Sequence, residues 1–181
     1  MKYIALLRGI NVGRHKRIKM ADLIKTFESI GFENVKTYLQ SGNIIFEYNT
    51  VDEAKIAEEI KAKISEAFEF SVNVIIRTDD ELENIVDNNP FVGKNGIALD
   101  KLHVTFLADI PDPEIISNLD INKDETERFE VINREVYLYC PNGYGRTKLT
   151  NDVFEKKLNT AATTRNWKTT NRLLEMSKLE K

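Results

Sequence analysis

The chain has 181 residues, of which 41% are hydrophobic and 30% charged, and its formal net charge is −3. A chain of this length buries about 70% of its unfolded surface, so we expect one sizeable domain or two small ones that need no disulfide or metal for stability. No stretch approaches the roughly 20 apolar residues of a membrane span, which argues against a membrane partner. The lone Cys140 is typical of the reducing cytoplasm, where we place the protein.

Sequence patterns in the first half alternate between strand and helix. The stretch "KYIALLR" is typical of a buried strand, and residues 20–30 carry apolar side chains at helical spacing. The β-rich stretches "VKTYLQ" and "NIIFEY" meet at Ser41-Gly42 as a hairpin, a second amphipathic helix follows, and "VNVIIR" is a further strand. This order predicts an α+β fold whose first half, residues 1–78, is ferredoxin-like with the order β-α-β-β-α-β.

Weaker patterns continue through the second half. Residues 79–98 are expected to form a helix and then a linker, "FVGKNG". Beyond it, strands are predicted at "LHVTFLA", "RFEVIN" and "EVYLYC", with a short helix after Pro113 and another at "DVFEKKL". The chain is expected to be helical from about Thr164 to its end. The pattern of residues 99–181 therefore predicts a second α+β half that is related to the first but incomplete, because a helix replaces its final strand.

Positive charge gathers in two segments without carboxylates, residues 8–19 and residues 156–174. Residues 8–19 carry five Lys/Arg side chains and no carboxylate. Within this segment, residues 13–16 ("GRHK") share their pattern with residues 145–148 ("GRTK"), and both lie between a predicted strand and a predicted helix. A glycine loop before a helix presents backbone N–H groups and partial positive charge, which Arg and Lys side chains reinforce. The two loops predict a cleft for a phosphate-bearing or other anionic small molecule.

Polar side chains around these loops are the candidate contacts. We expect Arg8, Arg146, Lys148 and Arg165 to bind the anion, and Gln40, Ser41 and Asn43 to orient it. Arg165 is expected in the first turn of the final helix, after an N-cap at Thr163 or Thr164. The structural alternatives are a solvated basic loop and a plain hairpin turn at Ser41-Gly42.

Several chemistries lack their motifs. The sequence has no G-x-x-x-x-G-K-[ST], no G-x-G-x-x-G after a strand and no G-x-S-x-G. His15 and His103 have no His or Cys partner at metal-ligand spacing. We therefore expect neither a metal nor a cofactor, and no motif identifies a reaction or an oligomeric state.

Taken together, the segments "IALLRGINVG", "KMADL", "TYLQSGNIIF", "GYGRTKLTN" and "ATTRNW" resemble the bacterial family called domain of unknown function 1697. The resemblance covers nearly the whole chain and implies paired ferredoxin-like halves but no activity. Its signature positions add Asn11, Gly13, Tyr144 and Asn166 to the candidate ligand contacts. The chain departs from the usual family pattern, in each case adding bulk or charge, at Arg14, Lys16 and Lys168.

These observations favour the binding of an anionic small molecule over other functions. Three further classes stay open: a nucleic-acid-binding protein, an enzyme acting on an anionic metabolite, and a protein-interaction scaffold. The acidic net charge and the lack of an RNP1-like segment count against nucleic acid as a partner.

Overall fold

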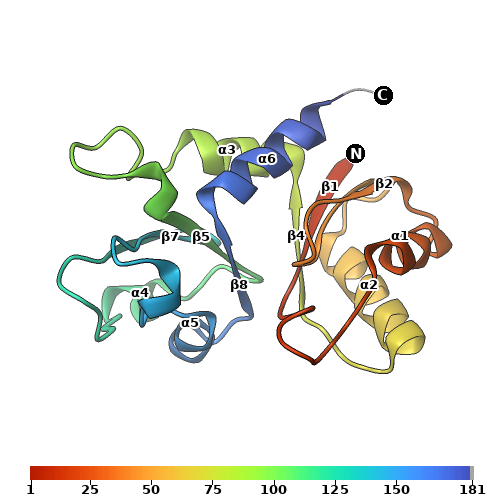
Figure 1. Cartoon of the computed structure of the whole chain (residues 1–181), viewed down its shortest axis with the longest axis horizontal. Coiled ribbons are helices and arrows are strands. Elements are labelled where there is room, and N and C mark those ends of the chain that lie inside the picture. Colours follow the sequence, from red (N-terminus) through yellow and green to blue (C-terminus); the bar gives the residue numbers. More distant parts are fainter. Residues whose placement is uncertain (180–181) are drawn as a thin grey trace. The chain divides into compact units, whose positions relative to one another are not determined.

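The computed structural model describes residues 1–179 and divides the chain into two compact units (Figure 1). Unit 1 comprises Met1–Glu83 and the segment from Arg172 onward, and unit 2 comprises Asn84–Asn171. Each unit contains one four-stranded sheet in which every pair of neighbouring strands is antiparallel. The predicted α+β class is confirmed.

The sheet of unit 1 has the strand order β2-β3-β1-β4, so β1 pairs with β3 on one side and with β4 on the other. The predicted order of elements in the first half is confirmed. In chain order, unit 1 contains β1 (Lys2–Leu7), α1 (Met20–Ser29), β2 (Glu33–Thr37), β3 (Asn43–Glu47), α2 (Glu53–Phe68), β4 (Val74–Thr78) and the start of α3 (Asp79–Asp87).

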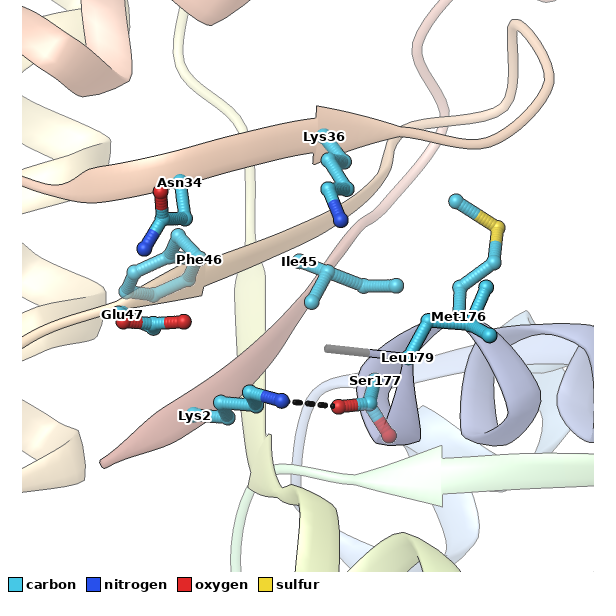
Figure 2. A pocket seen from close by; sticks show the side chains of 9 residues that line it. All are labelled: Lys2, Asn34, Lys36, Ile45, Phe46, Glu47, Met176, Ser177 and Leu179. Carbon is cyan, nitrogen blue, oxygen red and sulfur yellow. Dashed lines mark hydrogen bonds between the residues drawn. The ribbon is translucent and has the colours of Figure 1, made fainter. Parts of the chain in front are cut away.

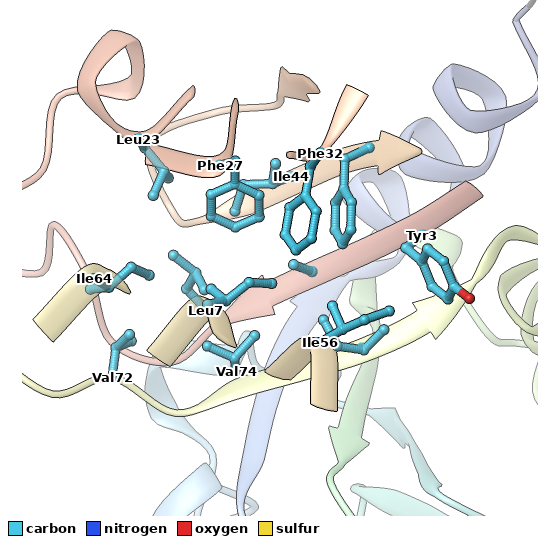
Figure 3. Close-up of a cluster of buried hydrophobic side chains, with 14 of the residues drawn as sticks. Tyr3, Leu7, Leu23, Phe27, Phe32, Ile44, Ile56, Ile64, Val72 and Val74 are labelled. Atoms are coloured by element: carbon cyan, nitrogen blue, oxygen red, sulfur yellow. The ribbon is translucent and has the colours of Figure 1, made fainter. Parts of the chain in front are cut away.

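The core of unit 1 lies between one face of its sheet and the helices α1 and α2 (Figure 3). Strand β1 contributes Tyr3 and Leu7, α1 contributes Phe27, and α2 contributes Ile56 and Ile64, all completely buried. Because the apolar residues of α1 and α2 recur at helical spacing, each helix turns one continuous stripe toward the sheet. The periodicity visible in the sequence therefore identifies this core correctly.

The helices are amphipathic rather than apolar throughout. Helix α2 buries Ile56, Ile60 and Ile64 on one side and carries the surface ion pair between Lys61 and Glu58 on another. Within residues 1–179, no helix has both the length and the apolar character that crossing a bilayer requires.

The sheet of unit 2 has the order β6-β7-β5-β8, which matches that of unit 1 strand for strand, so the two halves are similar. Its core gathers Leu138, Phe154 and Leu158 around β7 and α5. In chain order, the remaining elements are the short 3₁₀ helix η1 (Leu99–Lys101), β5 (Leu102–Leu107), α4 (Pro113–Ser117), β6 (Arg128–Ile132), β7 (Glu135–Tyr139), the 3₁₀ helix η2 (Tyr144–Arg146), α5 (Asn151–Leu158), β8 (Ala162–Asn166) and α6 (Trp167–Lys178).

The expectation of an incomplete second half with a helix from Thr164 is wrong, because Ala162–Asn166 forms the strand β8 beside β5. The β-branched Thr163 and Thr164 favour an extended backbone, and Arg165 takes a buried position in the ladder opposite Val104. Helix α6 starts only at Trp167. A buried arginine in a polar strand resembles a helix start in sequence, which explains the error.

Two buried arginines occupy corresponding positions in the final strand of each sheet. Arg77 in β4 pairs with Ile4 of β1, and Arg165 in β8 pairs with Val104 of β5. Their side chains are 1% and 8% exposed, respectively. Each guanidinium donates to the carbonyl of the preceding residue, at 2.7 Å for Arg77 and 2.9 Å for Arg165. The two arginines thus have matching buried environments, as expected for side chains that stabilise the fold.

We therefore predict that Arg165→Ala lowers the free energy of unfolding by about 2–4 kcal/mol, because it empties a buried site and strips acceptors of their donor. Urea unfolding measures the change, and Arg165→Met, which keeps most of the apolar stem, should lose less. An unchanged unfolding midpoint for Arg165→Ala would show that this side chain has no structural role.

Candidate functional site

The loop between β1 and α1 is held at both ends by apolar side chains. Ile10 and Ile18 are 2% and 4% exposed and belong to the core of unit 1. The residues between them, from 12 to 17, are all exposed. The burial of the two isoleucines thus fixes the ends of a segment that presents its cations to solvent.

The Asn11 side chain closes this loop. Its Nδ2 donates to the carbonyl of Ile18 at 3.0 Å and to that of Gln40 at 2.8 Å, while its Oδ1 accepts from the Ile18 N–H at 2.9 Å. The Asn11 N–H also donates to the Lys16 carbonyl at 3.0 Å. Because these backbone groups engage its amide, Asn11 positions the loop.

The turn at Ser41-Gly42 packs against the end of β1. The Leu7 N–H donates to the Gly42 carbonyl at 2.8 Å. A Cβ on Gly42 would lie 2.6 Å from the Leu7 Cβ, and its φ of +77° belongs to the left-handed region. The buried Asn43 donates from Nδ2 to the Tyr38 carbonyl at 2.8 Å and to Ser41 Oγ at 2.9 Å. The packing and hydrogen bonds of the turn therefore explain why Gly and Asn occupy positions 42 and 43.

A pocket of about 460 Å³ lies beside this loop, at the amino end of α1 and the carboxyl end of α2. Two of the predicted contacts, Asn11 and Gln40, come together there. The complete lining is Asn11, Arg17, Ile18, Lys19, Asp22, Gln40 and Phe68. Its volume lies within the range of small-molecule sites, roughly 300–1,000 Å³.

The charges of this pocket come from Arg17, Lys19 and Asp22. Arg17 and Lys19 are exposed, and within residues 1–179 neither cation forms an ion pair. No side chain caps the amino end of α1, whose N-cap position is Lys19, so first-turn N–H groups of the helix add partial positive charge. The Asp22 carboxylate supplies one acceptor on the same lining.

The remaining candidates of unit 1 do not line this pocket. Arg8 is half-buried and its N–H donates to the Asn73 carbonyl at 2.9 Å. Gly13 is exposed with a φ of +61° at the tip of the loop. Ser41 lies in the turn below. The sequence patterns located the loop correctly but gave no signal for Phe68, which reaches the pocket from α2.

The second basic loop belongs to unit 2 and connects β7 to α5. Arg146 and Lys148 are exposed there. Tyr144 stacks on His103 of β5, with ring centroids 4.8 Å apart and planes at 24°. Thr150 accepts the Val153 N–H at 3.4 Å and caps α5, so this loop does open a helix, as predicted.

His103 is half-buried, and within the described residues its Nδ1 is buried without a hydrogen-bond partner. Loss of solvation lowers the pKa of His103 below its ordinary value of 6.5. The imidazole is therefore held neutral at physiological pH.

The last two candidates, Arg165 and Asn166, lie in β8. The Arg165 guanidinium donates to Thr163 Oγ1 at 2.8 Å, and burial lowers its pKa to about 10, which leaves it charged at neutral pH. Asn166 Oδ1 accepts the Thr169 N–H at 2.7 Å and caps α6. Asn166 thus takes the capping role that the sequence assigned to Thr163 or Thr164.

A second pocket in unit 1, of about 330 Å³, was not expected from the sequence (Figure 2). Lys36 and Ile45 project into it from β2 and β3, opposite Met176 near the end of α6. Lys2 Nζ donates to the Ser177 carbonyl at 2.8 Å across its floor. None of the candidate residues lines it, and its residues form no motif.

The fold and the pocket define an α+β protein of two similar halves with a basic pocket beside its first strand. Residues 1–137 match the family described as "Protein of unknown function (DUF1697)", and the chain belongs to that family. Its structure is also similar to that of a conserved bacterial protein from Streptococcus pneumoniae, at 23% sequence identity and a TM-score of 0.76 over 98% of each chain. No curated protein matches the chain. The resemblance seen in the sequence is confirmed.

Gly42→Ala tests the packing of the turn. We expect it to cost more than Gly9→Ala, since Gly9 has a similar φ of +71° but nothing within 4 Å of its Cβ position. Backbone strain alone costs about 1–2 kcal/mol, and the clash with Leu7 adds about 1–3 kcal/mol. Chemical denaturation of both variants gives the difference, and equal losses would contradict the close approach.

A pH dependence of stability should come from His103. Because its folded-state pKa is depressed, the unfolded chain takes up a proton first as the pH falls below 6.5, so the free energy of unfolding decreases from about pH 7.5 to about pH 5.5. The His103→Gln variant should lose less stability over that interval in thermal melts. A variant that loses as much as the wild type would assign the effect to other groups.

Proposed function

We propose that the protein binds an anionic small molecule, such as a phosphate-bearing metabolite, in the pocket between the β1–α1 loop and α2. The observation that carries this proposal is the pairing of Arg17 and Lys19, two cations on one pocket lining that have no ion pair within residues 1–179. An anion seated between them gains charge-assisted hydrogen bonds and the field of the uncapped helix.

The construction of the loop supports this assignment. Arg17 and Lys19 flank Ile18 in the sequence, and Ile18 is buried in the core. The buried side chain therefore holds the backbone of both cationic residues in place. The Asn11 hydrogen bonds hold the loop closed. Binding then orders mainly side chains rather than backbone, which reduces its entropic cost.

The equivalent place in unit 2 provides an internal comparison. We infer that the halves arose by duplication of a ferredoxin-like unit, which the shared strand order and the matched Arg77 and Arg165 support. The counterpart of the basic loop is then the connection from β5 to α4, residues 108–112, and not the loop that holds Gly145. The pocket beside that connection includes Asp112 and Glu114 on its lining. At this place in the fold, cations outnumber acids on the pocket lining in unit 1, and acids outnumber cations in unit 2.

Asp22 restricts which anions fit. Its carboxylate lies on the same lining as the two cations, so it repels a bare anion and accepts a hydrogen bond from a ligand that also carries a hydroxyl or amine. A ligand with an anionic group and a separate donor satisfies both parts of the pocket.

Calorimetric titration with inorganic phosphate at low ionic strength tests the proposal. Arg17→Ala and Lys19→Ala should each weaken binding roughly five- to tenfold, because each removes a hydrogen bond to a charged group. Arg14→Ala is the matched control: it removes a cation from the same loop that does not line the pocket, and it should change the affinity less than about twofold.

Equal losses in all three variants would indicate diffuse attraction and overturn the pocket assignment. The nucleic-acid alternative is examined with a random oligonucleotide. Binding that exceeds that of phosphate and falls steeply with salt would favour it.

A further inference from the structure

Phe68 gives the anion pocket an apolar wall that an anion alone does not use. It is the last residue of α2, is half-buried, and packs against the core of unit 1 on its inner side. Phe70 stacks on it with ring centroids 6.3 Å apart and planes at 29°. The left-handed Glu69, at φ 60°, ends the helix and separates the two rings along the chain.

The size of the pocket exceeds what an inorganic anion fills. Its volume is about 460 Å³, whereas a phosphate group takes the place of only a few water molecules at about 30 Å³ each. The remaining space borders Phe68 and Ile18. Removing the apolar surface of these side chains from water is favourable, so an apolar part of a ligand is a better occupant of this space than water.

The lining is divided by chemistry. Arg17 and Lys19 supply cations, Phe68 supplies an aromatic surface, and Gln40 and Asp22 supply hydrogen-bonding groups. Aromatic rings pair favourably in offset-stacked or edge-to-face geometry. A molecule with an anionic group joined to a flat ring matches this division, whereas a bare anion or an aliphatic chain uses only part of it.

We propose, on the basis of the anion site above, that the ligand is an organic anion of the aryl phosphate type, whose aromatic ring lies against Phe68 while its phosphate lies between Arg17 and Lys19. Polar substituents on the ring then reach Gln40 and Asp22. The pocket selects its ligand by the ring as well as by the charge.

Affinities of four probes for the wild-type protein test the ring: inorganic phosphate, methyl phosphate, cyclohexyl phosphate and phenyl phosphate. Phenyl phosphate should bind roughly tenfold more tightly than methyl phosphate, because burial of the ring removes apolar surface from water. It should also bind more tightly than cyclohexyl phosphate, because only a flat ring stacks. Equal binding of methyl and phenyl phosphate overturns the inference but leaves the anion site standing.

Equal binding of cyclohexyl and phenyl phosphate also overturns it, since the wall would then recognise any apolar body. If none of the four probes binds, the proposed anion site fails, and the ring inference fails with it. The two failures are thus distinguishable.

Phe68→Leu and Phe70→Leu form a matched pair of variants. Both shorten an aromatic side chain that packs on the same core, but only Phe68 lines the pocket. Phe68→Leu should lower the affinity for phenyl phosphate roughly fivefold and the affinity for methyl phosphate less than about twofold. Phe70→Leu removes no atom of the pocket lining and keeps an apolar side chain behind Phe68, so it should change both affinities by no more than about twofold. The same loss for both variants would indicate a general effect on the fold and contradict a direct contact.

Discussion

The close approach of Gly42 to Leu7 is the contact on which the rest of the site depends. Without a side chain at Gly42, the hairpin turn lies directly on the end of β1 and its carbonyl accepts the Leu7 N–H at 2.8 Å. That placement brings the Gln40 carbonyl within 2.8 Å of Asn11 Nδ2. The basic loop is therefore closed onto a turn that packs on β1 because Gly42 has no Cβ.

Arginine serves two physically different purposes in this chain. Arg77 and Arg165 are buried in the final strands, where hydrogen bonds to neighbouring carbonyls satisfy part of each guanidinium. Arg17 is exposed on a loop and has no ion pair within residues 1–179. A buried guanidinium is held among the groups of the fold, whereas the donors of an exposed guanidinium face solvent. Burial therefore separates the structural arginines of the strands from the exposed arginine of the loop.

Periodic patterns made most of the fold predictable, because the stripes of α1 and α2 and the apolar strands β1, β3 and β4 follow directly from burial on one side of a helix or within a sheet. The strand β8 was missed because its burial is carried by Thr163 and Arg165, which sequence reasoning places at helix ends or in solvent. The basic loop was predictable from its charge. The hydrogen bond from Asn11 to Gln40 spans 29 residues, and Phe68 reaches the pocket from a helix still further along the chain, so no local pattern contains either contact.

Similar sheets with different loops place specificity in the connections rather than in the scaffold. In unit 1, the pocket after the first strand meets the amino end of α1 and the carboxyl end of α2. In unit 2, the corresponding pocket joins α4 to Lys157, near the carboxyl end of α5. Both halves thus have a hollow that reaches the helix after the first strand and the helix before the last strand. The charges around the two hollows differ: two cations and one acid in unit 1, against two acids and one cation in unit 2. These charged side chains lie outside the buried core of each half, so the surroundings of the two hollows differ while the strand order stays the same.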